Sequence, residues 1–155
     1  MLRIYATPSF NVMGRESIMS INYQAIQIGE TLPPLQISPI TRTTLALFAG
    51  ASGDHNPIHI DLDFAQKAGM PDVFAHGMLS MAWLGRLLTQ WVPQRQIVQF
   101  NSRFAGITHL GDAPLCTGKV IEKFEHDGQQ LLKVELRVTY QRGDVKIIGD
   151  TLISI

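Results

Sequence analysis

Residues 76–92 place the strongest constraint on what this chain can fold into. The segment reads HGMLSMAWLGRLLTQWV, and its apolar residues fall on nearly every side of a helix. A helix with that pattern is buried rather than laid on a surface. It is too short and too polar near its end to span a membrane. The chain must therefore supply another layer to cover this helix. The polar or small interruptions are Ser80, Gly85, Arg86, Thr89 and Gln90.

Strand periodicity begins after residue 92 and predicts that layer. Residues 130–141 alternate, which is typical of a strand with one solvated face. One face carries Leu132, Val134, Leu136, Val138 and Tyr140, and the other carries Leu131, Lys133, Glu135, Arg137 and Thr139. Residues 97–104, 113–125 and 145–155 also predict strands, and the turns HDGQ and RGD suit hairpins. We therefore predict an α+β fold in which one antiparallel sheet packs on one buried helix.

The segments before the buried helix predict one short strand and two further helices. GETLPPLQIS, residues 29–38, is typical of a turn that leads into a strand. Thr41 can cap a helix, and Gly50 and Gly53 then end it. Residues 61–69 predict a short amphipathic helix that closes on a glycine. The predicted order is strand, helices and then a run of antiparallel strands.

The length of 155 residues suits one domain. We assign residues 21–155 to that domain and residues 1–20 to an N-terminal extension. The extension has neither the continuous apolar core nor the small-residue cleavage site of a signal peptide. Cys116 is the only cysteine, so no internal disulfide can form, and a reducing compartment such as the cytoplasm fits.

Charged residues make up only 17% of the chain, against about 25% in an ordinary domain. This composition predicts that part of the surface is covered, most simply by a second copy of the chain. Thirteen basic and thirteen acidic residues give a net charge of zero. No basic stripe is present to bind nucleic acid or an anionic membrane.

Titratable and turn-forming residues gather in the stretch GASGDHNPIHID, and a metal site is one interpretation of them. His55 and His59 are four apart, which would place both on one face of a helix. Pro57 lies between them and disfavours a helix there, so the helical zinc motif fails. A loop site could still recruit Asp54 and His76.

Nucleophilic hydrolysis is a second interpretation of the same stretch. Ser52 lies between glycines, but the pattern is not the G-x-S-x-G of a strand-to-helix elbow. Cys116 falls in a strand pattern far in sequence from any histidine. Neither residue therefore matches a known nucleophile arrangement.

General acid–base chemistry by Asp54 and His59 is the third interpretation. The turn can fold so that both side chains converge, and a carboxylate with an imidazole can hold a water and transfer protons at neutral pH. Asn56 and Pro57 stiffen such a turn. The simpler alternative is a turn in which the aspartate caps a backbone N–H and the histidine is merely packed.

His76 and Gly77 open the buried helix and favour chemistry over that simpler alternative. The N-terminus of a helix offers free backbone N–H groups. Such groups can bind a developing oxyanion.

The longer segment FAGASGDHNPIHIDLDFAQKAGMPDVFAHGMLSMAWLG resembles the hydratase 2 signature of the MaoC-like (R)-specific enoyl-thioester hydratases and dehydratases. The elements S-G-D-x-N-P-x-H, FAQKAG and AHGML follow in the family's order. VPQRQIVQFNSRFAGITHLGD is similar to the strand and turn that come next in the family. The resemblance covers roughly residues 24 to 155.

The resemblance implies a single hot-dog domain, in which an antiparallel sheet wraps around a long central helix. It implies that Asp54 and His59 are the catalytic pair and that Asn56 positions them. The backbone N–H of Gly77 matches the family's oxyanion donor. His55 falls at a variable position of the motif and has no implied role.

The chain departs from the family pattern at Gly85. Some relatives carry a serine at this position that orients the aspartate. Ser80 is the nearest hydroxyl along the helix. Either Ser80 or a water takes over that role here, or the pair is less well oriented.

The activity implied by the resemblance is the reversible hydration of trans-2-enoyl thioesters of coenzyme A or acyl carrier protein in fatty-acid metabolism. No cofactor is implied, and the sequence contains no dinucleotide or P-loop motif. Two alternatives stay open: a hot-dog thioesterase, and a non-catalytic acyl-binding subunit of a heteromeric dehydratase. The implied assembly is a homodimer, or else a heterodimer with a related subunit.

Overall fold

The protein is described from a computed structural model, which covers residues 22, 25–140 and 143–155. The N-terminal extension predicted for residues 1–20 lies outside the described residues. The boundary of the domain therefore stays a prediction.

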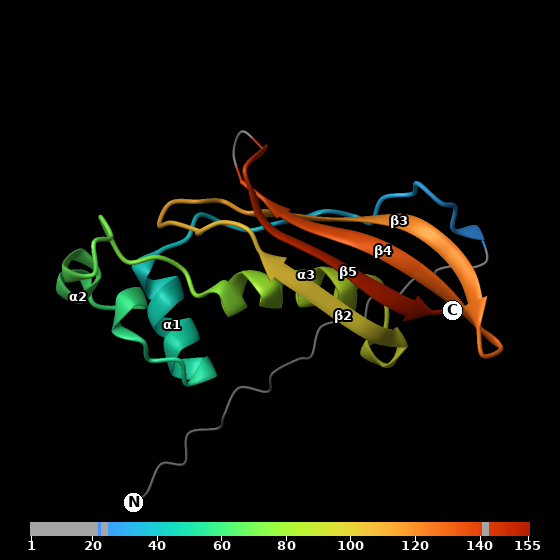
Figure 1. Cartoon of the computed structure of the whole chain (residues 1–155), viewed down its shortest axis with the longest axis horizontal. Helices are drawn as coiled ribbons and strands as arrows, with labels where there is room; N and C mark the ends of the chain where they lie inside the picture. The colour runs from blue at the N-terminus through green and yellow to red at the C-terminus, as the bar shows by residue number, and fades with distance from the viewer. Residues whose placement is uncertain (1–21, 23–24, 141–142) are drawn as a thin grey trace, which may run out of the picture.

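The main layer is a five-stranded antiparallel sheet with the order β1-β3-β4-β5-β2. Its strands lie close to the ranges that the alternating pattern predicts, and β2 agrees at both ends. The sheet arches over the rest of the domain, as Figure 1 shows. The strands are β1 (Leu35–Gln36), β2 (Ile97–Phe104), β3 (Leu115–His126), β4 (Gln129–Thr139) and β5 (Val145–Ser154).

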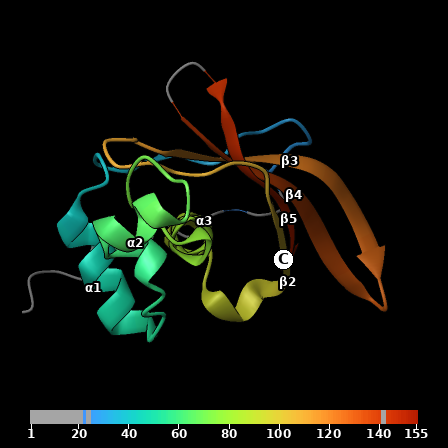
Figure 2. The same ribbon diagram turned by 60° about the vertical axis from the view of Figure 1, so that its left-hand side comes forward.

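Helix α3 (Gly77–Trp91) lies inside the curve of this sheet. It contacts β2, β3 and β4, and Figure 2 shows it nearly end-on beneath the strands. The prediction of a sheet wrapped around one long helix is confirmed. The helix is nevertheless not buried on every side, because the Met78 side chain is 53% exposed and Arg86 is exposed too. One face of α3 is therefore left open by the chain's own sheet.

The two faces of β4 differ in burial as the alternation predicts. Leu132, Val134, Leu136 and Val138 are fully buried in the core that includes α3. Leu131 departs from the prediction, since it is buried although the alternation places it on the opposite face. It lies outside the main core cluster and pairs with Phe124 of β3.

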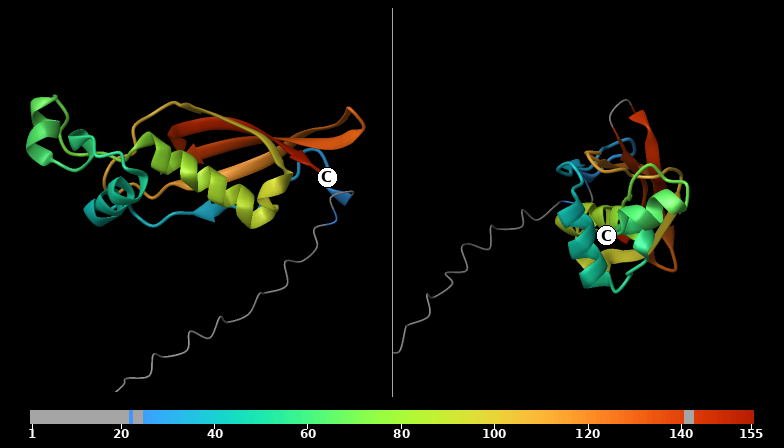
Figure 3. Two further views of the ribbon diagram at one scale, coloured as in Figure 1. Left: turned by 90° about the horizontal axis from the view of Figure 1, so that it is seen from below. Right: turned by 90° about the vertical axis from the view of Figure 1, so that its left-hand side faces the viewer.

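Two helices lie beyond the N-terminal end of α3, as Figure 3 shows. Helix α1 (Arg42–Ser52) begins with a capping box made by Thr41 and Thr44. It ends at Gly53, whose left-handed φ of 75° suits glycine, so Gly50 lies within the helix and does not end it. Helix α2 (Leu62–Lys67) is capped by Asp61.

Two short 3₁₀ helices complete the described secondary structure. The segment η2 (Pro57–His59) connects α1 to α2, and η3 (Gln94–Gln96) connects α3 to β2. No helix in the part of the chain that the structure describes is long and apolar enough to cross a membrane.

Candidate active site

The turn between α1 and α2 is held by hydrogen bonds between its own side chains and backbone. Oδ1 of Asp54 accepts the N–H of Asn56 at 3.2 Å. Oδ1 of Asn56 then accepts the N–H of Ile58 at 3.2 Å and so caps η2, the segment that carries His59. Asn56 is thus the link between the carboxylate and the imidazole, which fits the positioning role expected for it.

The ring of His59 is oriented by Phe74. The imidazole Nδ1 lies 2.8 Å from the carbonyl oxygen of Phe74, and a carbonyl can only accept a hydrogen bond, so Nδ1 carries the proton. The Phe74 ring also meets the His59 ring edge-on at 4.9 Å between centroids. In the neutral ring, Nε2 therefore keeps a bare lone pair that can accept a proton.

His76 joins this pair from the first residue before α3. Its ring lies 3.9 Å from that of His59, centroid to centroid, with a tilt of 31°. Its Nε2–H donates to the backbone carbonyl of Asp54 at 3.1 Å. One ligand-type atom from each of Asp54, His59 and His76 lies within 4.8 Å of the others. The structure thus brings together the two residues expected to be catalytic and adds a second histidine.

Burial lowers the pKa of His76 below its ordinary value of 6.5, and the neighbouring His59 lowers this pKa further. The hydrogen bond to the Asp54 carbonyl and the charge of the Asp54 carboxylate both raise this pKa, but the effect of burial is larger. His76 is only 1% exposed, and its Nδ1 has no hydrogen-bond partner among the described residues. The folded protein therefore holds this imidazole neutral at a pH where a free histidine would be protonated.

This shift predicts that the free energy of unfolding falls as the pH drops below about 6.5. The unfolded chain takes up a proton at His76 near that pH, whereas the folded chain resists the proton. Acid therefore favours unfolding. Denaturant titrations between pH 7 and pH 5 measure the effect, and His76→Gln should reduce the slope of stability against pH. An unchanged slope in that variant would show that other groups carry the pH dependence.

A metal site is the alternative that this cluster must be tested against. Each histidine already uses one ring nitrogen on a backbone carbonyl, which leaves one nitrogen per ring for an ion. The two rings are stacked, however, with only 31° between their planes. Lone pairs lie in the ring plane, so two rings that overlap this closely are poorly placed to direct both lone pairs at one tetrahedral ion. The geometry suits proton transfer better than metal binding.

Gly77 stands next to the cluster as the first residue of α3. Its N–H has no preceding helical turn to donate to, so it is free to bind a ligand oxygen. A Cβ at this position would lie 3.1 Å from the ring of Phe104. Glycine is thus suited to the close packing here.

A small cavity of about 160 Å³ begins at Gly77. Its walls are mainly apolar and come from the residues before α3, from the end of β2 and the loop after it, and from β5. An apolar cavity of about 150 Å³ can hold a benzene molecule, so this one has room for a short acyl chain. The lining side chains are Phe74, Ala75, Ser80, Phe104, Ile107, Thr108 and Ile147.

Ser80 lies on the cavity side of α3. Its hydroxyl is buried and pairs with the hydroxyl of Thr108 at 3.3 Å, and no hydrogen bond joins it to Asp54 in the described part of the chain. A role for Ser80 in orienting the aspartate therefore stays a prediction, which this hydrogen bond does not support. Gly85 lines a different hollow, between α3 and β2.

Of the residues that line the cavity, sequence reasoning named only Gly77 and Ser80 as candidates for the site. The stretch RFAGITHLGD contains Phe104 and Thr108 and resembles the family. That resemblance could have pointed to these two residues, but it assigned no role to any single residue of the stretch.

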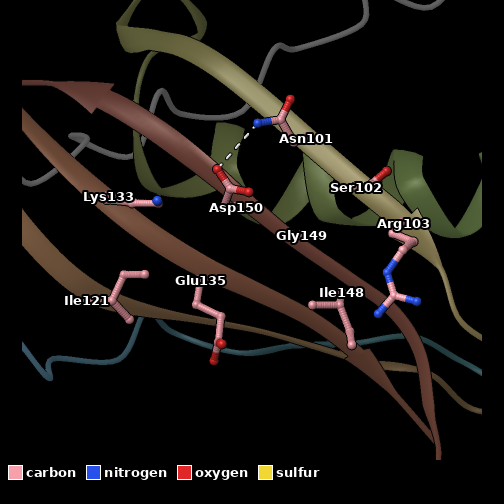
Figure 4. A pocket seen from close by; sticks show the side chains of 9 residues that line it. All are labelled: Asn101, Ser102, Arg103, Ile121, Lys133, Glu135, Ile148, Gly149 and Asp150. Atoms are coloured by element: carbon pink, nitrogen blue, oxygen red, sulfur yellow. Dashed lines mark hydrogen bonds between the residues drawn. The ribbon is translucent and has the colours of Figure 1, made fainter.

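A larger hollow than this cavity lies elsewhere. Figure 4 shows it on the face of the sheet turned away from α3, with a volume of about 420 Å³. Arg103 and Lys133 line it together with Glu135 and Asp150, and Asn101 donates to Asp150 at 3.4 Å. It is open, carries charges of both signs and includes no residue of the acid–base turn, so it takes no part in the site.

The two candidate nucleophiles, Cys116 and Ser52, lie in environments that support the fold. Cys116 is fully buried in β3, and burial raises the pKa of its thiol to about 12. It therefore stays a thiol, which is a poor nucleophile. The hydroxyl oxygen of Ser52 accepts the N–H of Asp54 at 3.2 Å and so helps to set the turn.

Comparisons with known proteins agree with this geometry. Residues 24–141 match the family model of the MaoC like domain. The (R)-specific enoyl-CoA hydratase of Rhodospirillum rubrum is 32% identical over 80 residues, which is 50% of this chain and 56% of that protein. The fatty acid synthase subunit beta of Saccharomyces cerevisiae is 29% identical over 119 residues, or 74% of this chain. This chain spans only 6% of the length of that yeast protein.

A similar solved structure is the R-hydratase PhaJ1 from Pseudomonas aeruginosa in its unliganded form. It superposes with a TM-score of 0.73 at 27% identity, covering 85% of this chain and 84% of that one. The hot-dog fold expected from the sequence is thereby confirmed.

Proposed function

The chain belongs to the MaoC-like dehydratase family, and from this premise we propose that it catalyses the reversible addition of water to trans-2-enoyl thioesters to give (3R)-3-hydroxyacyl thioesters. The observation that carries the proposal is the convergence of Asp54 and His59 on His76. The next residue, Gly77, begins α3 and lines an apolar cavity. An acid–base pair, an oxyanion donor and a place for an acyl chain are what this reaction needs.

Polarisation of the thioester is the first part of the mechanism. The carbonyl oxygen would accept the Gly77 N–H at the start of α3. Negative charge develops on this oxygen as water adds to C3, and one such donor contributes about 3–4 kcal/mol to transition-state stabilisation in other enzymes. The acyl tail would lie in the cavity between Phe74 and Phe104.

Proton transfer is the second part. The Asp54 carboxylate and the bare Nε2 of His59 would hold the water between them. As the water oxygen bonds to C3, one of the two groups takes a proton from the water, and a proton is delivered to Cα. Dehydration runs through the same steps in reverse, and neither direction consumes a cofactor.

Two rivals are separated by one assay on the purified protein. Crotonyl-CoA is supplied while enoyl absorbance and free thiol are followed together. Loss of absorbance without thiol is the expected result and identifies a hydratase. Thiol release identifies a thioesterase. Neither signal with crotonyl-CoA or with crotonyl acyl carrier protein would favour a non-catalytic subunit, although the presence of both Asp54 and His59 argues against that case.

We expect only the (3R) product, because the water is held on one side of the bound alkene by the Asp54–His59 pair. The Rhodospirillum rubrum relative is likewise an (R)-specific hydratase. Coupling the product to an (S)-specific hydroxyacyl-CoA dehydrogenase provides the test. Appreciable reduction of its nicotinamide would contradict the assignment.

The active form is proposed to be a homodimer. Strand β2 lies at the edge of the sheet and pairs only with β5 within the described chain, so its other edge is open to a second copy. Val98 on this strand is 55% exposed, and the open face of α3 lies alongside, with a hollow of about 360 Å³ between them. Closed two-fold pairs are the commonest solution for such surfaces.

Pairing would also complete the site. Phe104 and Ile107 line the cavity yet remain 51% and 41% exposed in one chain, so the apolar mouth lacks a cover. Light scattering on the isolated protein should give a mass near twice 17.2 kDa. An active monomer would contradict the proposal, and an inactive dimer that gains activity from a related subunit would indicate the heteromeric case.

A further inference from the structure

His76 touches both members of the proposed catalytic pair without belonging to it. Its Nε2–H holds the backbone carbonyl of Asp54, and its ring covers one face of His59 at 3.9 Å. The Phe48 ring of α1 packs edge-on against His76 at 4.9 Å between centroids, so the imidazole is also held by an aromatic contact.

We propose that His76 is a positioning residue that fixes the geometry of the Asp54–His59 pair and does so as a permanently neutral imidazole. This inference rests on the proposed hydratase function and names a further residue for that reaction. The donated hydrogen bond sets where the Asp54 backbone lies, and the stacked ring sets the plane in which the Nε2 lone pair of His59 points.

Neutrality follows from the surroundings of the ring. With Nε2–H already donated to Asp54, an added proton would go to Nδ1, which is buried and has no acceptor among the described residues. An N–H buried without an acceptor is strongly disfavoured. His76 also precedes the N-terminus of the 15-residue helix α3, where the helix dipole disfavours a positive charge.

The reaction itself gives a reason for this neutrality. His59 can take up a proton during turnover, and a charged ring stacked against it at 3.9 Å would oppose that step. The titratable groups that face His76 are Asp54 and His59, and Phe48 is uncharged. The Asp54 carboxylate favours a charged ring, but burial outweighs this effect. A neutral His76 orients the pair without competing for its proton.

Two substitutions separate the hydrogen bond from the stack. His76→Gln can keep an N–H donor near the place of Nε2 but removes the ring, and His76→Phe keeps a ring but removes the donor. We expect each variant to lower kcat about 10- to 100-fold, the range that misplacement of reacting groups by about 1 Å produces. KM should change little, since His76 does not line the cavity. His126→Gln, on the exposed β3–β4 hairpin, is the control and should keep full activity.

The pH profile and a double variant separate positioning from plain structural support. The acid and base limbs of kcat/KM should stay in place while the plateau falls. In an Asp54→Asn background, His76→Gln should cost less than about twofold further, because residues that act as a unit are not additive. The same loss in both backgrounds would indicate a merely structural residue. If one limb of the pH profile of kcat/KM disappeared in the variant, His76 would itself carry a proton in the reaction. If the plateau of kcat/KM were unchanged, His76 would have no role in the reaction.

Histidine NMR on the wild-type protein tests neutrality without substrate. The Nε2–H form of His76 should persist from pH 7 down to about pH 6, where more than half of a free histidine is protonated. Appearance of a His76 imidazolium in that range would overturn the inference. Because this spectrum needs no turnover, it still decides the state of His76 if the wild-type protein proves unable to hydrate any enoyl thioester, an outcome that would refute the proposed function instead.

Discussion

Asp54→Asn is expected to lower the rate of enoyl-thioester hydration at least ~100-fold, a loss within the range that a positioned acid–base group supplies. The amide keeps the size of the carboxylate. It also keeps an oxygen that can accept the N–H of Asn56, which sets the turn. The negative charge and the capacity to take up a proton are lost. Initial rates with the best thioester substrate, per mole of folded protein, measure the effect.

The fold should be unaffected by this substitution, because Asp54 is exposed and makes no ion pair in the described structure. Thermal unfolding and circular dichroism of the variant should therefore match the wild type. Near-full activity in a correctly folded Asp54→Asn protein would show that the acid–base assignment is wrong.

His59→Ala should cause a loss of similar size, and His55→Ala provides the matched control. His59 is buried, directed by Phe74 and stacked on His76, whereas His55 is exposed. Removal of His59 deletes the bare Nε2 that can exchange a proton. We expect a fall of about 100-fold for His59→Ala and little change for His55→Ala.

The milder variant His59→Asn guards against a trivial loss of folding. Its side-chain amide can still donate to the carbonyl of Phe74, but it cannot act as a base near neutral pH. It should be as inactive as His59→Ala and more stable. Equal losses from substitution of His55 and His59 would contradict the assignment of the pair.

The layout of the domain was largely predictable because its signals are periodic. The alternation in residues 130–141 identified the buried face of β4, and the apolar segment 76–92 identified α3. The open face of α3 was not predictable, since Met78 is apolar and only the path of the sheet decides whether it is covered. Gly50 inside α1 shows likewise that a glycine alone does not end a helix when the cap lies further on.

The acid–base turn was predictable from local chemistry, whereas its surroundings were not. Asp54, Asn56 and His59 lie within one short turn, so their spacing limits where they can go. The contact of His76 with this turn joins residues 22 positions apart. The pairing of Ser80 with Thr108 spans 28 positions. Such contacts depend on how α3 and the loop after β2 meet in space, and no local pattern encodes that meeting.

Incorporation of labelled oxygen tests the central claim most directly. The purified protein is incubated with crotonyl-CoA in H₂¹⁸O, and the products are analysed by mass spectrometry. If the Asp54–His59 pair adds water to the double bond, the label appears in the hydroxyl on C3 of an intact thioester, and the Asp54→Asn variant forms this product far more slowly. Label found only in the carboxylate of a released enoic acid would contradict the account and identify thioester hydrolysis in its place.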